Sequence, residues 1–151
     1  MRGPGSGPGT DRRGSTMDYT LELVVVPVSD VDRAKAFYID GTGFKEDVDH
    51  RAGDDFRVVQ LSPPGSACAI AIGVGITDAA PGSTRGLHLV VTDIEAARAE
   101  LTGRGVEVSE IRHMTPQGWQ PGVDPQRTDY ASFADFRDPD GNVWLLQERG
   151  H

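Results

Sequence analysis

The sequence is poor in cysteine, in basic residues and in long apolar runs, and each shortage excludes a class of protein. Cys68 is the single cysteine among 151 residues, so no disulfide can form within the chain. No apolar run reaches the roughly 18 residues that a membrane-spanning helix needs. Lysine and arginine number 15 against 23 acidic residues, and the net charge of −8 repels nucleic-acid phosphates. We therefore expect a cytoplasmic protein that binds neither nucleic acid nor membrane.

The N-terminal segment differs in composition from the rest of the chain. Residues 1–16, MRGPGSGPGTDRRGST, contain mostly Gly, Pro, Ser and Arg and almost no large apolar side chain. Such a segment cannot offset the entropy cost of ordering by burial, so we predict a disordered tail. Residues 17–151 are long enough to bury a core and are expected to form one domain.

After residue 17 the chain repeats one order of elements, in modules at about 19–76 and 84–149. LELVVVPV and GLHLVV are apolar and β-branched, which is typical of buried strands. Each is followed by a helical pattern and then by a hairpin, FRVVQL–ACAIAI around SPPGS and YASFADF–VWLLQE around DPDGN. A short strand, KEDV or VEVSEI, precedes each hairpin. The sequence therefore predicts an α+β fold of two tandem βαβββ modules.

The helical segments carry cap and stripe signals. Ser29 or Asp30 is placed to cap the first helix, and Thr92 or Asp93 to cap the second. Apolar residues then recur at helical spacing on one face: Val31, Ala34, Phe37, Tyr38 in the first helix and Ile94, Ala97, Leu101 in the second.

Three segments resemble the signature segments of the vicinal oxygen chelate superfamily, which includes glyoxalase, bleomycin-resistance proteins and extradiol dioxygenases. They are LVVVPVSDVDRAKAFY, GLHLVVTDIEAARAELTGRGV and FADFRDPDGNVWLLQE, and the resemblance spans about residues 19–149. It implies that the sheets curl into a cup-shaped barrel with the helices outside. It also implies a homodimer whose ligand clefts are built from both chains. Enzymatic members hold a metal in the cup by His, Gln or Glu side chains.

The four positions at which the family places its metal ligands can be located by counting along the local patterns. They fall on hydrocarbon side chains and a glycine: Leu23, Ala69, Gly86, Leu145. None of these offers the imidazole or carboxylate that Zn, Ni, Fe or Mn prefers. We therefore expect a member of the family that lacks the metal site, with no metal or other cofactor and no catalytic residue, similar to bleomycin-resistance-type binding proteins.

Strand side chains alternate between faces, so the same positions assign the lining of the cup. His88 and Gln147 each lie two residues beyond a family ligand position and should face the cup as a hydrogen-bonded pair, whereas Glu22 and Glu148 should face away. The core should contain Val24, Val26, Val28, Leu89, Val91, Trp144, Leu146. The lining should contain Leu23, Val25, Ala67, Ala69, Ala71, Gly86, His88, Val90, Leu145, Gln147.

The segment 112–130, RHMTPQGWQPGVDPQRTDY, has no clear period and is expected to be a long loop. Trp119 within it is expected to fold over the cup or across a dimer partner. Tyr130 and Phe133 could stack on an aromatic ligand or serve as ordinary packing. Arg127 and Asp129 are expected to be solvated.

Three functions remain open on the sequence. The first is non-catalytic binding and sequestration of a hydrophobic, aromatic small molecule, as in antibiotic resistance. The second is a glyoxalase- or dioxygenase-like enzyme (a lyase, isomerase or ring-cleaving enzyme) with a displaced metal site at His88 and Gln147, or with metal-free chemistry by His88. This reading is disfavoured because no second strong acid or base is expected on the cup face. The third is a ligand-sensing or structural module. We favour the first.

Overall fold

The computed structural model describes residues 17–150, and the tail predicted over residues 1–16 lies outside them. The first module consists of β1 (Leu23–Val25), α1 (Val31–Ala36), the π-helical turn η1 (Phe37–Gly41), β2 (Lys45–Ala52), β3 (Phe56–Ser62) and β4 (Ala69–Val74). The second consists of β5 (Leu87–Val91), α2 (Ile94–Gly103), β6 (Arg112–Thr115), β7 (Gly118–Pro121), β8 (Ser132–Arg137) and β9 (Val143–Glu148).

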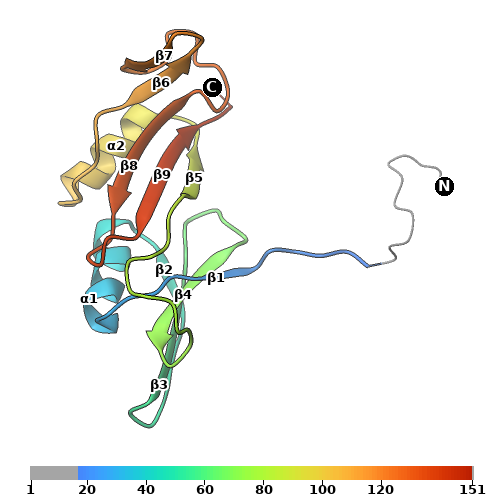
Figure 1. The fold of residues 1–151 in the computed structure, drawn as a ribbon, viewed down its shortest axis with the longest axis vertical. Coiled ribbons are helices and arrows are strands. Elements are labelled where there is room, and N and C mark those ends of the chain that lie inside the picture. Colours follow the sequence, from blue (N-terminus) through green and yellow to red (C-terminus); the bar gives the residue numbers. More distant parts are fainter. Residues whose placement is uncertain (1–16, 151) are drawn as a thin grey trace.

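Each module contributes one sheet. The strand order is β1-β4-β3-β2 in sheet 1 and β5-β9-β8-β6-β7 in sheet 2. In both sheets the first strand of the module pairs in parallel with its last strand, and the other pairs are antiparallel. Figure 1 shows the two sheets arranged along the long axis of the molecule, with α1 and α2 on the same side. The predicted α+β class and the two tandem modules are confirmed.

Both helices begin at the predicted aspartates. Asp30 accepts a hydrogen bond from the Arg33 amide, and Asp93 accepts one from the Ala96 amide, each at 3.0 Å. These bonds satisfy amide groups that a helix N-terminus otherwise leaves unpaired. The predicted apolar stripes face the core, in which Ala34 and Ile94 are fully buried.

Three elements differ from the prediction. β1 has three residues, because Pro27 lacks the amide hydrogen that would continue the ladder. The predicted strand VEVSEI is reduced to a single bridge between Val108 and Phe136. The Arg98 side chain donates hydrogen bonds to the carbonyl groups of Val108 and Ser109, so these are not free to pair with a neighbouring strand. The segment 112–130 was expected to be a loop without strands, but it contains the hairpin of β6 and β7.

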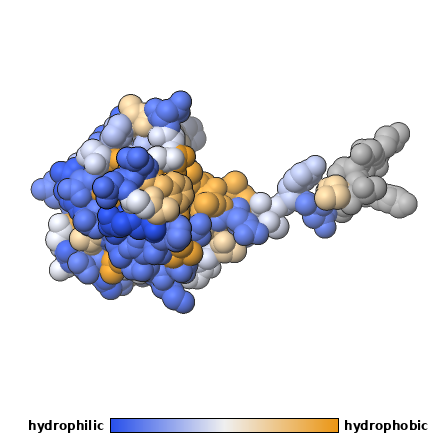
Figure 2. Space-filling view, turned by 90° about the horizontal axis from the view of Figure 1, so that it is seen from below, coloured by the Kyte–Doolittle hydropathy of each residue, from blue (hydrophilic) through white to orange (hydrophobic). Residues whose placement is uncertain are grey.

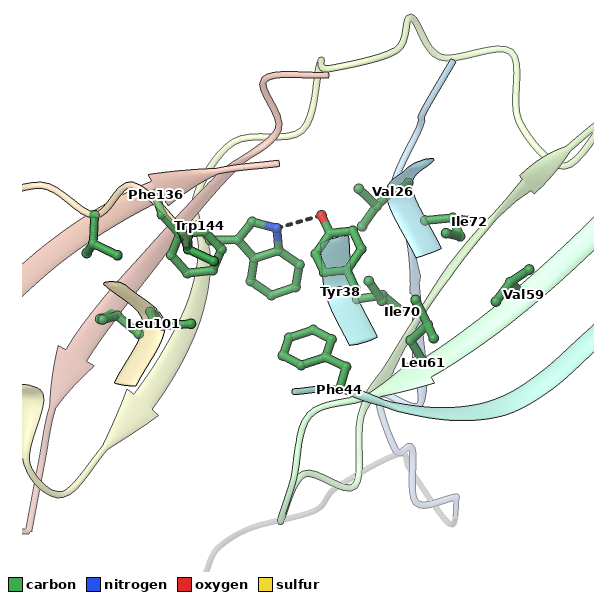
Figure 3. Close-up of a cluster of buried hydrophobic side chains, with 14 of the residues drawn as sticks. Val26, Tyr38, Phe44, Val59, Leu61, Ile70, Ile72, Leu101, Phe136 and Trp144 are labelled. Carbon is green, nitrogen blue, oxygen red and sulfur yellow. Dashed lines mark hydrogen bonds between the residues drawn. The ribbon is translucent and has the colours of Figure 1, made fainter. Parts of the chain in front are cut away.

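The core runs through both modules. Figure 3 shows Tyr38 and Phe44 of the first module against Trp144 and Phe136 of the second. The Tyr38 ring is fully buried, and its hydroxyl accepts a hydrogen bond from Trp144 Nε1 at 2.9 Å and donates one to Asp138 at 2.8 Å. Burial and the neighbouring Asp138 carboxylate raise the pKa of Tyr38, which keeps the phenol neutral.

The DPDGN turn before β9 ties the modules together. Asp138 accepts bonds from the amides of Asp140 and Asn142, and the buried Asn142 side chain donates to the Pro27 carbonyl at 2.8 Å. Asp140 in turn accepts from the hydroxyl of Ser29 at 2.6 Å. The turn therefore fixes how the second module sits on the start of the first.

Candidate functional site

Each sheet has a face that points away from the helices, which we call its cup face. The expected core residues Val26, Trp144 and Leu146 are buried on the helix side. Other residues expected in the core, Val28, Leu89, Val91, are partly buried and pack against it, and Val24 is half-buried.

Figure 2 shows hydrophobic surface gathered near the point where the N-terminal segment leaves the body, while much of the remaining surface in that view is hydrophilic. The cup faces are therefore the candidate site.

The cup face of sheet 2 carries a row of three side chains across three strands. Leu145 of β9 pairs with His88 of β5 on one side and with Asp135 of β8 on the other. Leu145 stands where the family ligand glutamate was expected, so a neutral aliphatic side chain separates an imidazole from a carboxylate. Asp135 forms an ion pair with Arg112 at 3.7 Å.

The next row on the same face alternates apolar and polar side chains and leads to an aromatic pair. Gln147 pairs with Val90 of β5 and with Phe133 of β8, and Phe133 pairs with Arg112 of β6. Trp119 of β7 meets Phe133 edge to face, with ring centroids 5.3 Å apart, and the Arg112 guanidinium lies 5.1 Å from the Trp119 ring centroid. Trp119 is 48% exposed and Val90 51% exposed. The hairpin of β6 and β7 thus adds an aromatic platform to the cup face.

His88 and Gln147 lie together, as the alternation of strand side chains predicts. His88 Nδ1 is 2.8 Å from Gln147 Oε1, and Gln147 Nε2 donates to the Tyr130 carbonyl at 3.1 Å. Tyr130 itself has a positive φ of 67°, and the Arg149 guanidinium lies 5.8 Å from its ring centroid. The polar pair is therefore anchored to the backbone of the segment that leads into β8.

The cup face of sheet 1 is aliphatic. Leu23 pairs with Ala69, and Val25 pairs with Ala71, with Leu23 and Val25 about two-fifths exposed (40% and 38%). Beyond Ala71 the row continues through Gln60 of β3 to Val48 of β2. Neither residue is among those predicted from the sequence to line the cup. Ala67 is exposed and precedes β4, whereas Ala71 is buried.

Gly86 lies just outside the sheet. It precedes β5 with a positive φ of 79°, and a Cβ there would meet nothing within 4 Å. In the strand register it is His88 that stands across from Leu145, as Leu23 stands across from Ala69. The connection between β5 and α2 is thus shorter than that between β1 and α1, so counting seven residues back from the helix cap passes beyond the start of β5 to Gly86.

A metal centre does not fit the family positions in this chain. Leu23 and Ala69 are neighbours in sheet 1, and Leu145 lies in sheet 2 beside His88. The three hydrocarbon side chains supply no lone pair, and the His88 imidazole alone does not make a metal site. Across residues 17–150, no group of three or more His, Cys, Asp or Glu side chains is placed to hold a metal ion. We therefore derive no chemical step through a metal.

The expectation that the cup face has no strong acid or base besides His88 is wrong. The register of β8 on β9 places Asp135 beside Leu145, and that of β6 on β8 places Arg112 beside Phe133. The alternation of buried and exposed residues along SFADFR could have revealed Asp135, because Ala134 and Phe136 are apolar and belong to the core.

Arg127 was expected to be solvated, but it binds a buried carboxylate. Its side chain donates to Glu148 at 2.9 Å and also pairs with Glu95 of α2. Glu148 faces away from the cup, as predicted, and its Oε2 accepts from the Ile94 amide at the start of α2. A glutamate on the core face of a strand requires a cationic or hydrogen-bonding partner. The predicted placement of Glu148 on that face could therefore have indicated that a basic residue such as Arg127 binds it.

The hollows on the helix side of sheet 2 are a poorer candidate. One of about 510 Å³ lies between α2 and the end of the β7 hairpin, lined in part by Glu95, Arg98 and Val123. Its lining mixes charged and apolar side chains, and Arg98 is already bonded to the Ser109 carbonyl at 2.8 Å. It lacks the aromatic platform and the polar pair of the cup face.

The fold and the signature segments define the class of protein. The chain belongs to the Glyoxalase/Bleomycin resistance protein/Dioxygenase superfamily, whose family model matches residues 20–146. Within the described residues, no helix has the length and apolar character needed to cross a membrane.

Particular relatives include two solved structures from Streptomyces sp. CB03234. TnmS3, an antibiotic binding protein, is 32% identical with a TM-score of 0.69 over 90% of this chain and 99% of that one. A glyoxalase/bleomycin resistance protein is 34% identical with a TM-score of 0.64, over 85% and 99%. The uncharacterized protein YetH of Bacillus subtilis (strain 168) is 25% identical over 85% of this chain and 97% of its own length.

Proposed function

We propose that this protein binds and sequesters a hydrophobic, planar aromatic small molecule on its cup faces, without a metal and without converting it. The observation that carries the proposal is the platform of exposed Trp119 and Val90 and half-buried Phe133 beside the polar pair His88–Gln147. Ligand sites typically combine such apolar surface with a few directed polar groups. The likeness to an antibiotic binding protein supports the same class of ligand.

We propose further that two copies of the chain complete the site. Each cup face leaves large apolar side chains exposed, among them Leu23 and Val25 in sheet 1 and Val90 and Trp119 in sheet 2. Large apolar side chains exposed on one face are typical of an interface or a ligand groove. In a homodimer, sheet 1 of one copy would cover sheet 2 of the other, which would enclose the ligand between an aliphatic and an aromatic wall.

The cytoplasmic location remains a prediction of the sequence.

The proposal is tested by measuring how planar aromatic natural products change the melting temperature of the protein. We expect at least one compound to stabilise the wild type and to be recovered chemically unchanged, because a ligand that binds the folded state raises its stability. Val90→Asp should abolish the shift by placing a charge on the platform. Val74→Asp is the matched control, because Val74 is also exposed but lies on the helix side, opposite Arg57.

Equal shifts in the two variants would contradict a site on the cup face of sheet 2. If no compound of a broad aromatic panel stabilises the wild type, sequestration of such ligands is excluded for that panel, and a structural or sensing module becomes the better account.

An enzyme of the same superfamily is the second candidate, and the position of Asp135 favours it. Asp135 and His88 flank Leu145 on one face, so an acid and a base are available to a substrate lying across β9. A displaced metal site would use His88 and Gln147, which lie within hydrogen-bond distance of each other. Elemental analysis after incubation with Ni, Mn, Zn and Fe(II) tests this reading: a stoichiometric metal that His88→Ala removes would establish it over sequestration.

A further inference from the structure

We infer that His88 presents an unprotonated Nε2 to the cup, so that the ligand must donate a hydrogen bond to it. This names the ligand class more narrowly than the proposed function on which it rests: a planar aromatic molecule bearing a hydroxyl or N–H group at its edge. The inference follows from the direction of two successive hydrogen bonds.

The first bond fixes the amide of Gln147. A backbone carbonyl can only accept, so the end of the amide that lies 3.1 Å from the Tyr130 carbonyl oxygen must be the donor, Nε2. The opposite orientation would place two oxygen acceptors against each other. The carbonyl end, Oε1, therefore points to His88.

The second bond fixes the tautomer of His88. Gln147 Oε1 can only accept, and it lies 2.8 Å from His88 Nδ1, so Nδ1 carries the hydrogen. In a neutral imidazole the other nitrogen is then an acceptor. Within residues 17–150 no protein group is hydrogen-bonded to His88 Nε2, and the residue is exposed on the cup face.

The surroundings of His88 favour the same kind of ligand. Two strands away in the same row, Asp135 offers a second acceptor, about 10 Å distant at the usual spacing of strands. The cationic side chains nearby are already directed at other groups: Arg112 at Asp135 and the Trp119 ring, and Arg149 at the Tyr130 ring. The row therefore presents acceptors at both ends of an apolar centre, Leu145.

The tautomer can be measured without any ligand, by two-dimensional NMR of ¹⁵N-labelled imidazole rings near neutral pH. We expect His88 to show Nδ1–H, and Gln147→Leu to shift it toward the Nε2–H form. His113 is the internal reference, because its Nδ1 lies 2.8 Å from the Gly122 carbonyl and must also carry the hydrogen. Its signals should be the same in both proteins. An Nε2–H tautomer at His88 in the wild type would overturn the inference and leave the proposed function untouched.

The ligand class is tested by calorimetry with β-naphthol and its methyl ether, which differ in the hydroxyl hydrogen. We expect the wild type to bind the naphthol roughly fivefold to tenfold more tightly, the factor that one ordinary hydrogen bond supplies. His88→Phe should remove the preference while retaining an aromatic side chain. Equal affinities in the wild type would overturn the inference while sequestration stands, whereas failure of both probes and of the wider aromatic panel would reject the proposed function and the inference together.

Discussion

Replacing Tyr38 by phenylalanine removes one oxygen atom from the junction of the two modules. The Tyr38 hydroxyl donates to the Asp138 carboxylate and accepts from the Trp144 indole, and the ring is fully buried. A hydrogen bond to a charged group contributes about 1.5–3 kcal/mol, and an orphaned buried donor costs about 1–3 kcal/mol. Asp138 keeps its bonds from the Asn142 side chain and amide, so the new unpaired group is the Trp144 N–H.

Because these contributions are not additive, we expect Tyr38→Phe to lower the free energy of unfolding by about 2–4 kcal/mol. Urea denaturation followed by circular dichroism measures this loss. Tyr19→Phe is the matched control, since Tyr19 is 87% exposed and should change stability by less than about 0.5 kcal/mol. A loss below about 1 kcal/mol in Tyr38→Phe would refute the reasoning that this hydroxyl holds the modules together.

The remaining predictions concern association and pH. In sedimentation experiments the wild type should be a dimer, and Val25→Asp should shift it toward monomer by charging the exposed cup face of sheet 1; a monomeric wild type would contradict the paired-cup arrangement. Hydrogen bonds from Arg57 and Lys35 lower the pKa of Asp49 well below its ordinary range, so this carboxylate stabilises the fold above its unfolded pKa of about 3.9 and loses that effect as the pH falls through the folded value. Asp49→Asn should therefore be less stable than the wild type near neutral pH, with the gap in urea midpoint closing below about pH 4; a gap independent of pH would exclude this ion pair as its cause.

Local signals in the sequence predicted the elements better than their junctions. The caps at Asp30 and Asp93 and the alternation along VWLLQE are local, and the structure agrees with them. The bonds of Tyr38 to Trp144 and Asp138 join residues about a hundred positions apart, and no local pattern reports such a contact.

The candidate site was predicted in part, for a similar reason. His88 and Gln147 follow from strand alternation within β5 and β9. The face of Asp135 also follows from alternation along SFADFR, but its place beside Leu145 depends on the pairing of β8 with β9. Arg112 and Gln60 depend on the registers of β6 and β3, so these two require the sheet to be known.

The most direct test of aromatic binding is a fluorescence titration of Trp119 with a planar aromatic compound that stabilises the protein. Trp119 lies on the platform, whereas Trp144, the other tryptophan of the chain, is buried in the core. We predict a saturable change in emission in the wild type that is absent in Trp119→Phe, although that variant should still bind the ligand measurably by calorimetry. An unchanged Trp119 signal at saturating ligand, or the same change in Trp119→Phe, would contradict binding at the cup face.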